Sequence, residues 1–449
     1  MKVVFISLGC DKNTVDTQQM AGMLQDSAAQ YTFTDDEEEA DIAVVNTCAF
    51  INSAKEESIG QILSLAERRK NGQLKALIVT GCLAQRYQEE IGKDIPEVDA
   101  VLGTTAEDQL GIVLDGILHG KSAPKVLTAD LDKVPAKQSA PVLSLESPVG
   151  YLKIAEGCNK CCSYCVIPSL RGHYRSVPME QVLEDAKTLL AGGVRELILV
   201  AQETTLYGVD LYGKKMLPEL LRRLCLLGGV RWIRILYCYP EEITKELVEV
   251  VRSEPRIVPY FDMPIQHASD KILKAMGRRT NRKELEEIIG YIREQIPNVC
   301  LRTTLITGFP GETEEDHREL LSFVRRMKFD RLGVFTYSKE EGTPAAAMKN
   351  QVHPSTKKRR QKELMLLQQQ IAFDAAEKMK DKVLDVIIEG KIADEDVYVG
   401  RTYKDIPGVD SNIFVETKRE LMTGDFIKAK VTGADGYDLI GEIYYESAQ

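Results

Sequence analysis

Cys158, Cys162 and Cys165, at the spacing Cys-x-x-x-Cys-x-x-Cys, are the residues of this chain best placed for metal chemistry. Their thiolates suit a four-iron iron–sulfur cluster, and a cluster that only carries electrons is usually held by four cysteines. Three protein ligands would leave one iron open to bind another molecule. The alternative is a structural zinc site, but such sites are tetrahedral and typically pair two Cys-x-x-Cys units. The spacing therefore favours a cluster with an open iron.

The register of this set has an alternative, because Cys161 adds a fourth thiol to the same stretch. Cys158, Cys161 and Cys165 would give the reversed spacing. Residues 151–156 have the pattern of a strand, so either set lies on the loop that leaves its carboxyl end. In β/α barrels, active sites are built from such loops.

A second set of cysteines follows three predicted strands, at residues 2–8, 41–46 and 76–80. The cysteines are Cys10, Cys48 and Cys82, and glycine precedes the first and the last. The carboxyl ends of parallel strands meet at one edge of a sheet, where ligands bind. Cysteine is also a common core residue, so one such placement would mean little. Three equivalent placements predict a second cluster with three cysteine ligands.

The hydrophobic patterning divides the chain into four segments. Residues 1–120 alternate buried strands with helices, which predicts a doubly wound, flavodoxin-like α/β domain. Residues 121–148 are rich in Ala, Ser, Pro and Lys and are expected to be a linker. Residues 149–380 hold six β/α units and a long helix, which predicts a partial TIM-type barrel open on one side. Residues 381–449 predict a small five-stranded antiparallel barrel.

Composition limits the location and the class of the protein. The 449 residues are enough for two or three domains. No apolar run is long enough to cross a bilayer, and the start lacks the pattern of a signal peptide, so we expect a cytoplasmic protein without a membrane partner. Ten cysteines in a reducing compartment favour metal binding over disulfides. The net charge of −10 weighs against a nucleic-acid partner.

The order of these parts resembles the methylthiotransferase family of radical S-adenosylmethionine enzymes, over nearly the whole chain. Tyr164 before Cys165, and Cys162 in the middle position, fit the family pattern and favour Cys158, Cys162 and Cys165 as the first set. Further matching stretches are residues 7–13, 46–50, 80–82, 171–172, 175–176 and 308–313. The resemblance implies two 4Fe-4S clusters, bound S-adenosylmethionine and a C-terminal TRAM domain.

The resemblance also implies a reaction. The cluster on Cys158, Cys162 and Cys165 would pass one electron to S-adenosylmethionine, and the resulting 5′-deoxyadenosyl radical would remove a hydrogen from the substrate. The cluster on Cys10, Cys48 and Cys82 would deliver a methylthio group. Expected S-adenosylmethionine contacts are Tyr164, Gln202, Gln266 and Arg302. We expect Arg302 at the end of a barrel strand, where it could grip the carboxylate.

Two kinds of substrate occur within this family. The sequence resembles the kind that modifies the β-carbon of an aspartate in a small-subunit ribosomal protein, number twelve. Residues 10–13, Cys-Asp-Lys-Asn, and residues 201–208 carry that resemblance, although Glu203 stands where Asp is expected. The first alternative is a tRNA adenosine methylthiotransferase, which shares every cysteine. The second is a non-catalytic two-cluster electron carrier or scaffold.

The expected partners follow from this assignment and from charge. They are a basic ribosomal protein and a reducing electron donor of the flavodoxin or ferredoxin type, with tRNA unlikely and the chain a monomer. Residues 381–449 contain eight Lys and Arg against fifteen Asp and Glu, which suits a basic partner. We expect Asp405 and Asp410, on one turn of the C-terminal barrel, to contact it.

Overall fold

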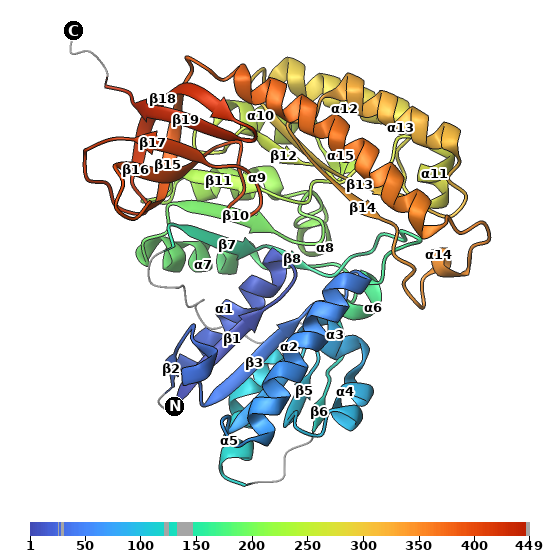
Figure 1. The fold of residues 1–449 in the computed structure, drawn as a ribbon, viewed down its shortest axis with the longest axis vertical. Coiled ribbons are helices and arrows are strands. Elements are labelled where there is room, and N and C mark those ends of the chain that lie inside the picture. Colours follow the sequence, from blue (N-terminus) through green and yellow to red (C-terminus); the bar gives the residue numbers. More distant parts are fainter. Residues whose placement is uncertain (26, 28–30, 121–124, 133–146, 446–449) are drawn as a thin grey trace.

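The computed structural model describes residues 1–25, 27, 31–120, 125–132 and 147–445. An α/β domain at the N-terminus lies against a partial β/α barrel, and a small β-barrel at the C-terminus packs on the far end of that barrel (Figure 1). All three parts match the fold class expected from the sequence.

The N-terminal domain is built on a six-stranded parallel sheet with strand order β2-β1-β3-β4-β5-β6. This is the flavodoxin-like order with one added strand. The strands are β1 (Lys2–Ser7), β2 (Thr32–Phe33), β3 (Ile42–Thr47), β4 (Ala76–Thr80), β5 (Ala100–Leu102) and β6 (Val126–Leu127). Every residue of β3 and β4 is buried, as a parallel sheet covered on both faces requires.

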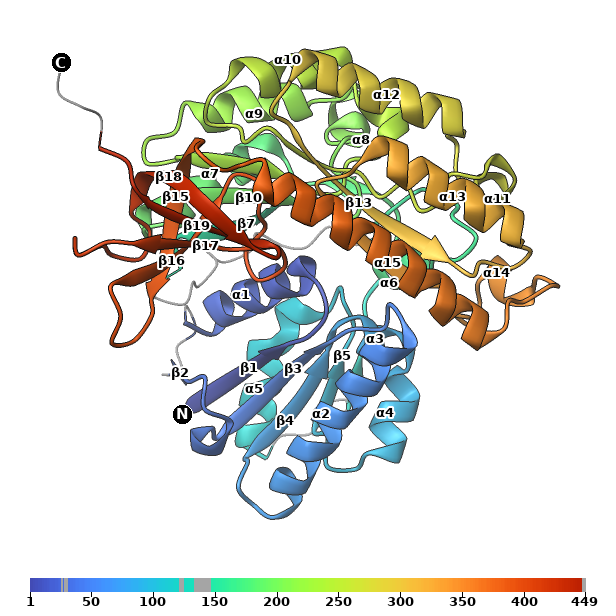
Figure 2. The ribbon, with the colours of Figure 1, turned by 45° about the horizontal axis from the view of Figure 1, so that its top comes forward.

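Helices cover both faces of this sheet (Figure 2). On one face lie α1 (Asp11–Gln25) and α5 (Leu110–Leu118); on the other lie α2 (Asn52–Lys70), α3 (Gly81–Arg86) and α4 (Gln88–Asp94). Met20 of α1 and Leu114 of α5 pack on Val44 of β3, whereas Ile62 of α2 packs on the opposite side. The domain therefore has two separate cores, one for each face.

The expected linker at residues 121–148 is corrected in part. Val126 and Leu127 form β6, which pairs with Val101 and Leu102 of β5 and completes the edge of the sheet. Both residues are β-branched or aliphatic and suit a strand, although the surrounding Ala, Ser, Pro and Lys conceal that signal. Residues 121–124 and 133–146 lie outside the described part of the chain.

The barrel contains the six parallel strands expected from the sequence, in the sheets β11-β10-β7 and β12-β13-β14. They are β7 (Val149–Lys153), β10 (Glu196–Val200), β11 (Trp232–Ile235), β12 (Tyr260–Asp262), β13 (Cys300–Thr307) and β14 (Arg331–Thr336). The helices are α6 (Ile167–Arg171), α7 (Met179–Ala191), α8 (Val209–Tyr212), α9 (Leu217–Cys225), α10 (Lys245–Ser253), α11 (Asp270–Ala275), α12 (Arg282–Gln295), α13 (Glu314–Met327), α14 (Pro344–Ala347) and α15 (Pro354–Glu377).

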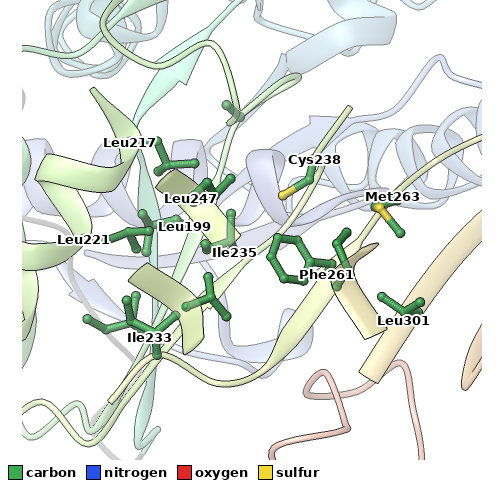
Figure 3. Packing of buried hydrophobic residues seen from close by; sticks show 14 of the residues in the cluster. Leu199, Leu217, Leu221, Ile233, Ile235, Cys238, Leu247, Phe261, Met263 and Leu301 are labelled. Atoms are coloured by element: carbon green, nitrogen blue, oxygen red, sulfur yellow. The ribbon is translucent and has the colours of Figure 1, made fainter. Parts of the chain in front are cut away.

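Alternation along the strands separates an apolar outside from an inside that holds both apolar and charged side chains. Leu199, Ile233 and Phe261 pack outward with Leu217 of α9 and Leu247 of α10 in one buried cluster (Figure 3). Successive side chains of a strand point to opposite faces. The intervening residues, among them Arg234, Asp262 and Arg302, therefore face the interior of the barrel, which is unusually rich in charge.

The C-terminal barrel closes in the order β15-β16-β17-β19-β18. Its strands are β15 (Val383–Lys391), β16 (Val397–Thr402), β17 (Ile413–Glu416), β18 (Phe426–Asp435) and β19 (Asp438–Ile443). Four of the pairings are antiparallel as expected, but β17 and β19 are parallel. Directions cannot alternate all the way round a ring with an odd number of strands, so one parallel pair is unavoidable.

This small barrel is fixed to the N-terminal ends of the large barrel's strands. Trp232 at the start of β11 meets Phe426 edge to face, with 4.9 Å between ring centroids. Glu196 at the start of β10 is fully buried between Arg234, at 2.7 Å, and Arg401 of β16, at 2.8 Å. Burial would raise the pKa of Glu196, but the two guanidinium groups hold that pKa below its usual value. A buried carboxylate thus joins the two barrels.

The expectation that Asp405 and Asp410 contact a partner is wrong. Asp405 is 2% exposed, and its carboxylate accepts hydrogen bonds from Arg331 of the large barrel and from the Thr402 hydroxyl. Asp410 accepts the Ile406 backbone N–H at 3.0 Å. The acidic turn faces the arginines at the base of the large barrel, which neutralise it. It therefore serves as an attachment between domains.

Removal of the Glu196 carboxylate should loosen this attachment. Glu196→Ala leaves the buried Arg234 guanidinium without its carboxylate and leaves Arg401 with Glu389 alone, and the loss of one partner from a buried pair costs about 3–5 kcal/mol. Glu249→Ala is the matched control, because its pair with Arg252 is half exposed and such pairs contribute about 1 kcal/mol or less. The free energies of unfolding of the two variants, measured by urea denaturation, should differ by several kcal/mol. Equal values would contradict the role of Glu196 in attaching the two barrels.

Candidate iron–sulfur sites at the domain interface

Cys10, Cys48 and Cys82 lie together at the carboxyl edge of the N-terminal sheet. They follow β1, β3 and β4, which are neighbours in the sheet. Burial, together with the nearby Cys82 and Cys10 thiols, raises the pKa of the Cys48 thiol to about 11. The pKa of Cys82 is raised for the same reasons, against the influence of Arg171. Thiols in this state ionise only when positive charge lies among them, which iron would supply.

Glycines directly before three of the cysteines, in both sets, allow the chain to pack closely there. Gly9 has a φ of +96°, and a Cβ there would lie 2.7 Å from the Cys48 sulfur. Gly81, before Cys82, and Gly157, before Cys158, also have positive φ, and a Cβ at either would overlap neighbouring backbone atoms. Only glycine adopts such a conformation readily and allows so close an approach.

The second set lies at the facing edge of the barrel, on the loop after β8 (Ala155–Glu156), which pairs with β9 (Arg175–Ser176). Backbone N–H groups of Lys160 and Ile167 donate to the Cys158 and Cys165 sulfurs, each at 3.4 Å. Burial, together with the nearby Cys162, raises the pKa of Cys158 to about 11 and that of Cys165 to about 12.

Cys161 differs from its three neighbours. Its side chain is exposed, and the sulfur lies 4.0 Å from the Asn159 carbonyl oxygen. Cys161 is not among the charges that shift the pKa of Cys158, Cys165 or Tyr164, whereas Cys162 acts on all three. The alternative register with Cys161 thus finds no support in the arrangement of this loop.

Arg278 was missed by the sequence reasoning. Its guanidinium lies 4.4 Å from the centroid of the Tyr239 ring, and Nη1 lies 4.0 Å from the Cys162 sulfur. The preceding Gly277 has a φ of +73°, and a Cβ there would lie 2.7 Å from the Cys161 carbonyl oxygen. The available signal in the sequence was a glycine directly before a charged residue, after a short helix. Glycine likewise directly precedes Cys10, Cys82 and Cys158.

The buried amide oxygens of Gln202 and Gln266, beside this loop, have no hydrogen-bond partner within the described residues. The Glu203 carboxylate instead lies 3.5 Å from the Lys160 ammonium. An unpaired buried acceptor is costly, so the two amide oxygens fit a ligand with several donors. S-adenosylmethionine has donors in its ammonium group, its adenine amino group and its ribose hydroxyls. Tyr164, also expected as a contact, packs beside Cys162 in the cluster around Ile306 and Phe309.

Arg302 does not lie where we expected it. It is the third of eight residues in β13, near the amino end of the strand rather than the carboxyl end. Its guanidinium lies 3.5 Å from the Asp262 carboxylate and 3.9 Å from that of Asp410. These two carboxylates neutralise the charge of the Arg302 guanidinium and hold it toward the base of the barrel.

A buried network of charges joins the two sets across the domain interface. Arg171, 3% exposed at the end of α6, donates to the Asp16 carboxylate at 2.6 Å, to the Asn13 side chain at 2.9 Å and to the Cys82 sulfur at 3.4 Å. Lys153 of β7 contacts the same Asp16 carboxylate.

The network continues to the other cluster loop. Lys153 also pairs with Glu156 at 3.0 Å, and Glu156 accepts a hydrogen bond from Gln202 at 2.6 Å. Asn13 and Asp16, three residues apart, share one face of α1. A continuous chain of contacts therefore runs from Cys82 to the residues beside Cys158.

Comparison with known proteins agrees with this architecture. The model of the "Uncharacterized protein family UPF0004" matches residues 2–103, that of the radical SAM superfamily residues 152–324, and that of the TRAM domain residues 382–443. A curated relative from Lachnoclostridium phytofermentans, named ribosomal protein uS12 methylthiotransferase RimO, is 59% identical over 98% of this chain and 99% of its own length. The chain belongs to the RimO family.

Other RimO relatives extend this result. Those of Clostridioides difficile and Geobacter sulfurreducens are each 46% identical, over 100% and 98% of this chain and of their own lengths. Among solved structures, the radical S-adenosylmethionine methyltransferase TsrM from Kitasatospora setae has a TM-score of 0.55 at 14% identity, over 77% of this chain and 73% of that one. At that identity the likeness extends to the fold alone. No group of three His, Cys, Asp or Glu side chains in the described part of this RimO-family chain is arranged to hold a single metal ion.

The two cysteine sets should bind iron independently. Cys10, Cys48 and Cys82 replaced together by Ser should leave half of the iron of the fully loaded protein, because the other set stays intact. Replacement of Cys225, Cys238 and Cys300 by Ala is the control, since these buried cysteines belong to neither set. Iron would be measured per chain after reconstitution. An N-terminal triple variant that kept all its iron would show that only one set binds a cluster.

Proposed function

We propose that this protein replaces a hydrogen on the β-carbon of an aspartate in ribosomal protein uS12 by a methylthio group. The observation that carries the proposal is the full-length match at 59% identity to a relative named for that activity. The two facing sets of three cysteines support it, because each would leave one iron of a four-iron cluster open. The tRNA alternative shares the cysteines, but the relatives reported above are named for uS12.

The proposal assigns roles to the chain's own residues. Cys158, Cys162 and Cys165 would hold the cluster that, with S-adenosylmethionine, supplies the radical that removes the hydrogen, and Cys10, Cys48 and Cys82 would hold the cluster that carries the methylthio group. Tyr164, Gln202 and Gln266 would bind S-adenosylmethionine. Arg171 and Asp16 hold the two loops in a fixed relation, and the surrounding buried side chains exclude water from a reaction that water would divert.

Several finer features belong to the same proposal. We infer a cytoplasmic monomer that takes electrons from a flavodoxin- or ferredoxin-type donor. All ten cysteines are free thiols, which suits a reducing compartment. In the residues that the structure describes, no helix has the length and apolarity to span a bilayer. The acidic C-terminal barrel favours a basic protein over tRNA, and its exposed Asp394, Glu395 and Asp396 replace Asp405 and Asp410 as the expected contacts.

The function is tested by offering both substrates to the same reconstituted protein. With reductant and S-adenosylmethionine, uS12 should gain a methylthio group on one aspartate, mapped by mass spectrometry, and unmodified tRNA should stay unchanged. The Cys10, Cys48 and Cys82 triple variant should still form 5′-deoxyadenosine but no methylthio product, and the Cys158, Cys162 and Cys165 triple variant should form neither.

Two outcomes would count against this assignment. Methylthiolated tRNA with unmodified uS12 would favour the tRNA enzyme. The absence of 5′-deoxyadenosine from the wild-type protein would favour an electron carrier or scaffold.

A further inference from the structure

Lys12 is a buried cation at the meeting point of the two domains. It lies in the first turn of α1, two residues after Cys10, and the residue is 8% exposed. Its ammonium nitrogen lies 3.5 Å from the centroid of the Tyr237 ring. Tyr237 follows β11 at the carboxyl end of the barrel strands and has a φ of +58°. Lys12 thus extends from the N-terminal domain onto the mouth of the barrel.

Lys12 differs from the other buried lysines of this interface in the anions it meets. Lys153 pairs with Asp16 and Glu156, and Lys160 lies within 3.5 Å of three carboxylates, those of Glu203, Glu241 and Glu242. Lys12 has no carboxylate within 4 Å among the described residues; its neighbours are Tyr237, Cys10 and Asp11. Arg302, toward the base of the barrel, already lies close to Asp262 and Asp410.

A buried ammonium without an anion is costly. The cost of removing a charge from water exceeds what a single aromatic face returns. Apart from the Cys10 sulfur beside it, an anion from outside would supply the partner that Lys12 lacks. Cys10, Asp11 and Tyr237, around Lys12, each keep part of their surface accessible.

We propose that Lys12 binds the carboxylate of the target aspartate of uS12 and thereby selects aspartate over its neutral analogues. This inference rests on the proposed function and names the residue that recognises its substrate. A carboxylate paired with Lys12 brings the adjacent β-carbon beside Cys10, on the side where the methylthio group would be held. An ammonium on the Tyr237 ring also has a fixed position, so it orients the substrate as well as attracting it.

The inference is tested with two peptides and two variants. One peptide spans the aspartate of uS12 that mass spectrometry maps as modified; the other carries Asn at that position. The reconstituted wild-type protein should bind the Asp peptide about tenfold more tightly than the Asn peptide, the effect of one charged hydrogen bond. Lys12→Met keeps the length and apolar stem of the side chain, and it should bind both peptides equally, at the affinity of wild type for the Asn peptide.

Lys283→Met is the matched control, since Lys283 is 85% exposed on α12 and pairs with the exposed Glu287. It should keep the tenfold preference. Iron content separates recognition of substrate from support of a cluster: Lys12→Met should retain all of its iron. A Lys12→Met protein that keeps the tenfold preference would overturn the inference, and so would one that loses half of its iron, since Lys12 would then serve the cluster on Cys10. If wild type leaves uS12 unmodified, the proposed function fails instead.

Discussion

The ion pair between Arg171 and Asp16 is the interaction on which the rest of this structure depends. The two cysteine sets belong to different domains, so their separation is fixed only by contacts across the interface. Arg171 comes from the barrel, directly after the loop of Cys165, and donates to Asp16, Asn13 and the Cys82 sulfur. A buried charge must meet its partner in good geometry or remain desolvated at high cost. This requirement selects one relative position of the two domains.

The same constraint explains the unusual charge inside the barrel. An ordinary barrel interior is filled with branched apolar side chains. Here Glu196, Arg234, Asp262 and Arg302 occupy interior positions, and each meets a partner of opposite sign. At the base these pairs attach the C-terminal barrel through Arg401. At the mouth of the barrel the ion pairs end beside the cysteines. Buried hydrogen-bond acceptors there remain free for a ligand.

Elements whose signal is local could be predicted from the sequence. The strand predicted at 76–80 has a continuous apolar pattern and forms with those bounds. The convergence of Cys10, Cys48 and Cys82 followed from one rule, that parallel strands share a carboxyl edge. Contacts between distant segments were not accessible in this way. An acidic turn such as that of Asp405 has the same local pattern whether it faces water or Arg331, and the tertiary pairing decides.

The central claim is that two iron–sulfur clusters face each other across the Arg171 bridge, each held by three cysteines. The most direct test is a crystal structure of the reconstituted protein with anomalous scattering measured at the iron absorption edge. The account predicts two separate iron peaks, one against Cys158, Cys162 and Cys165 and one against Cys10, Cys48 and Cys82, with the Arg171 side chain between the two loops. A single peak, or a peak in which Cys161 takes the place of Cys162, would contradict it.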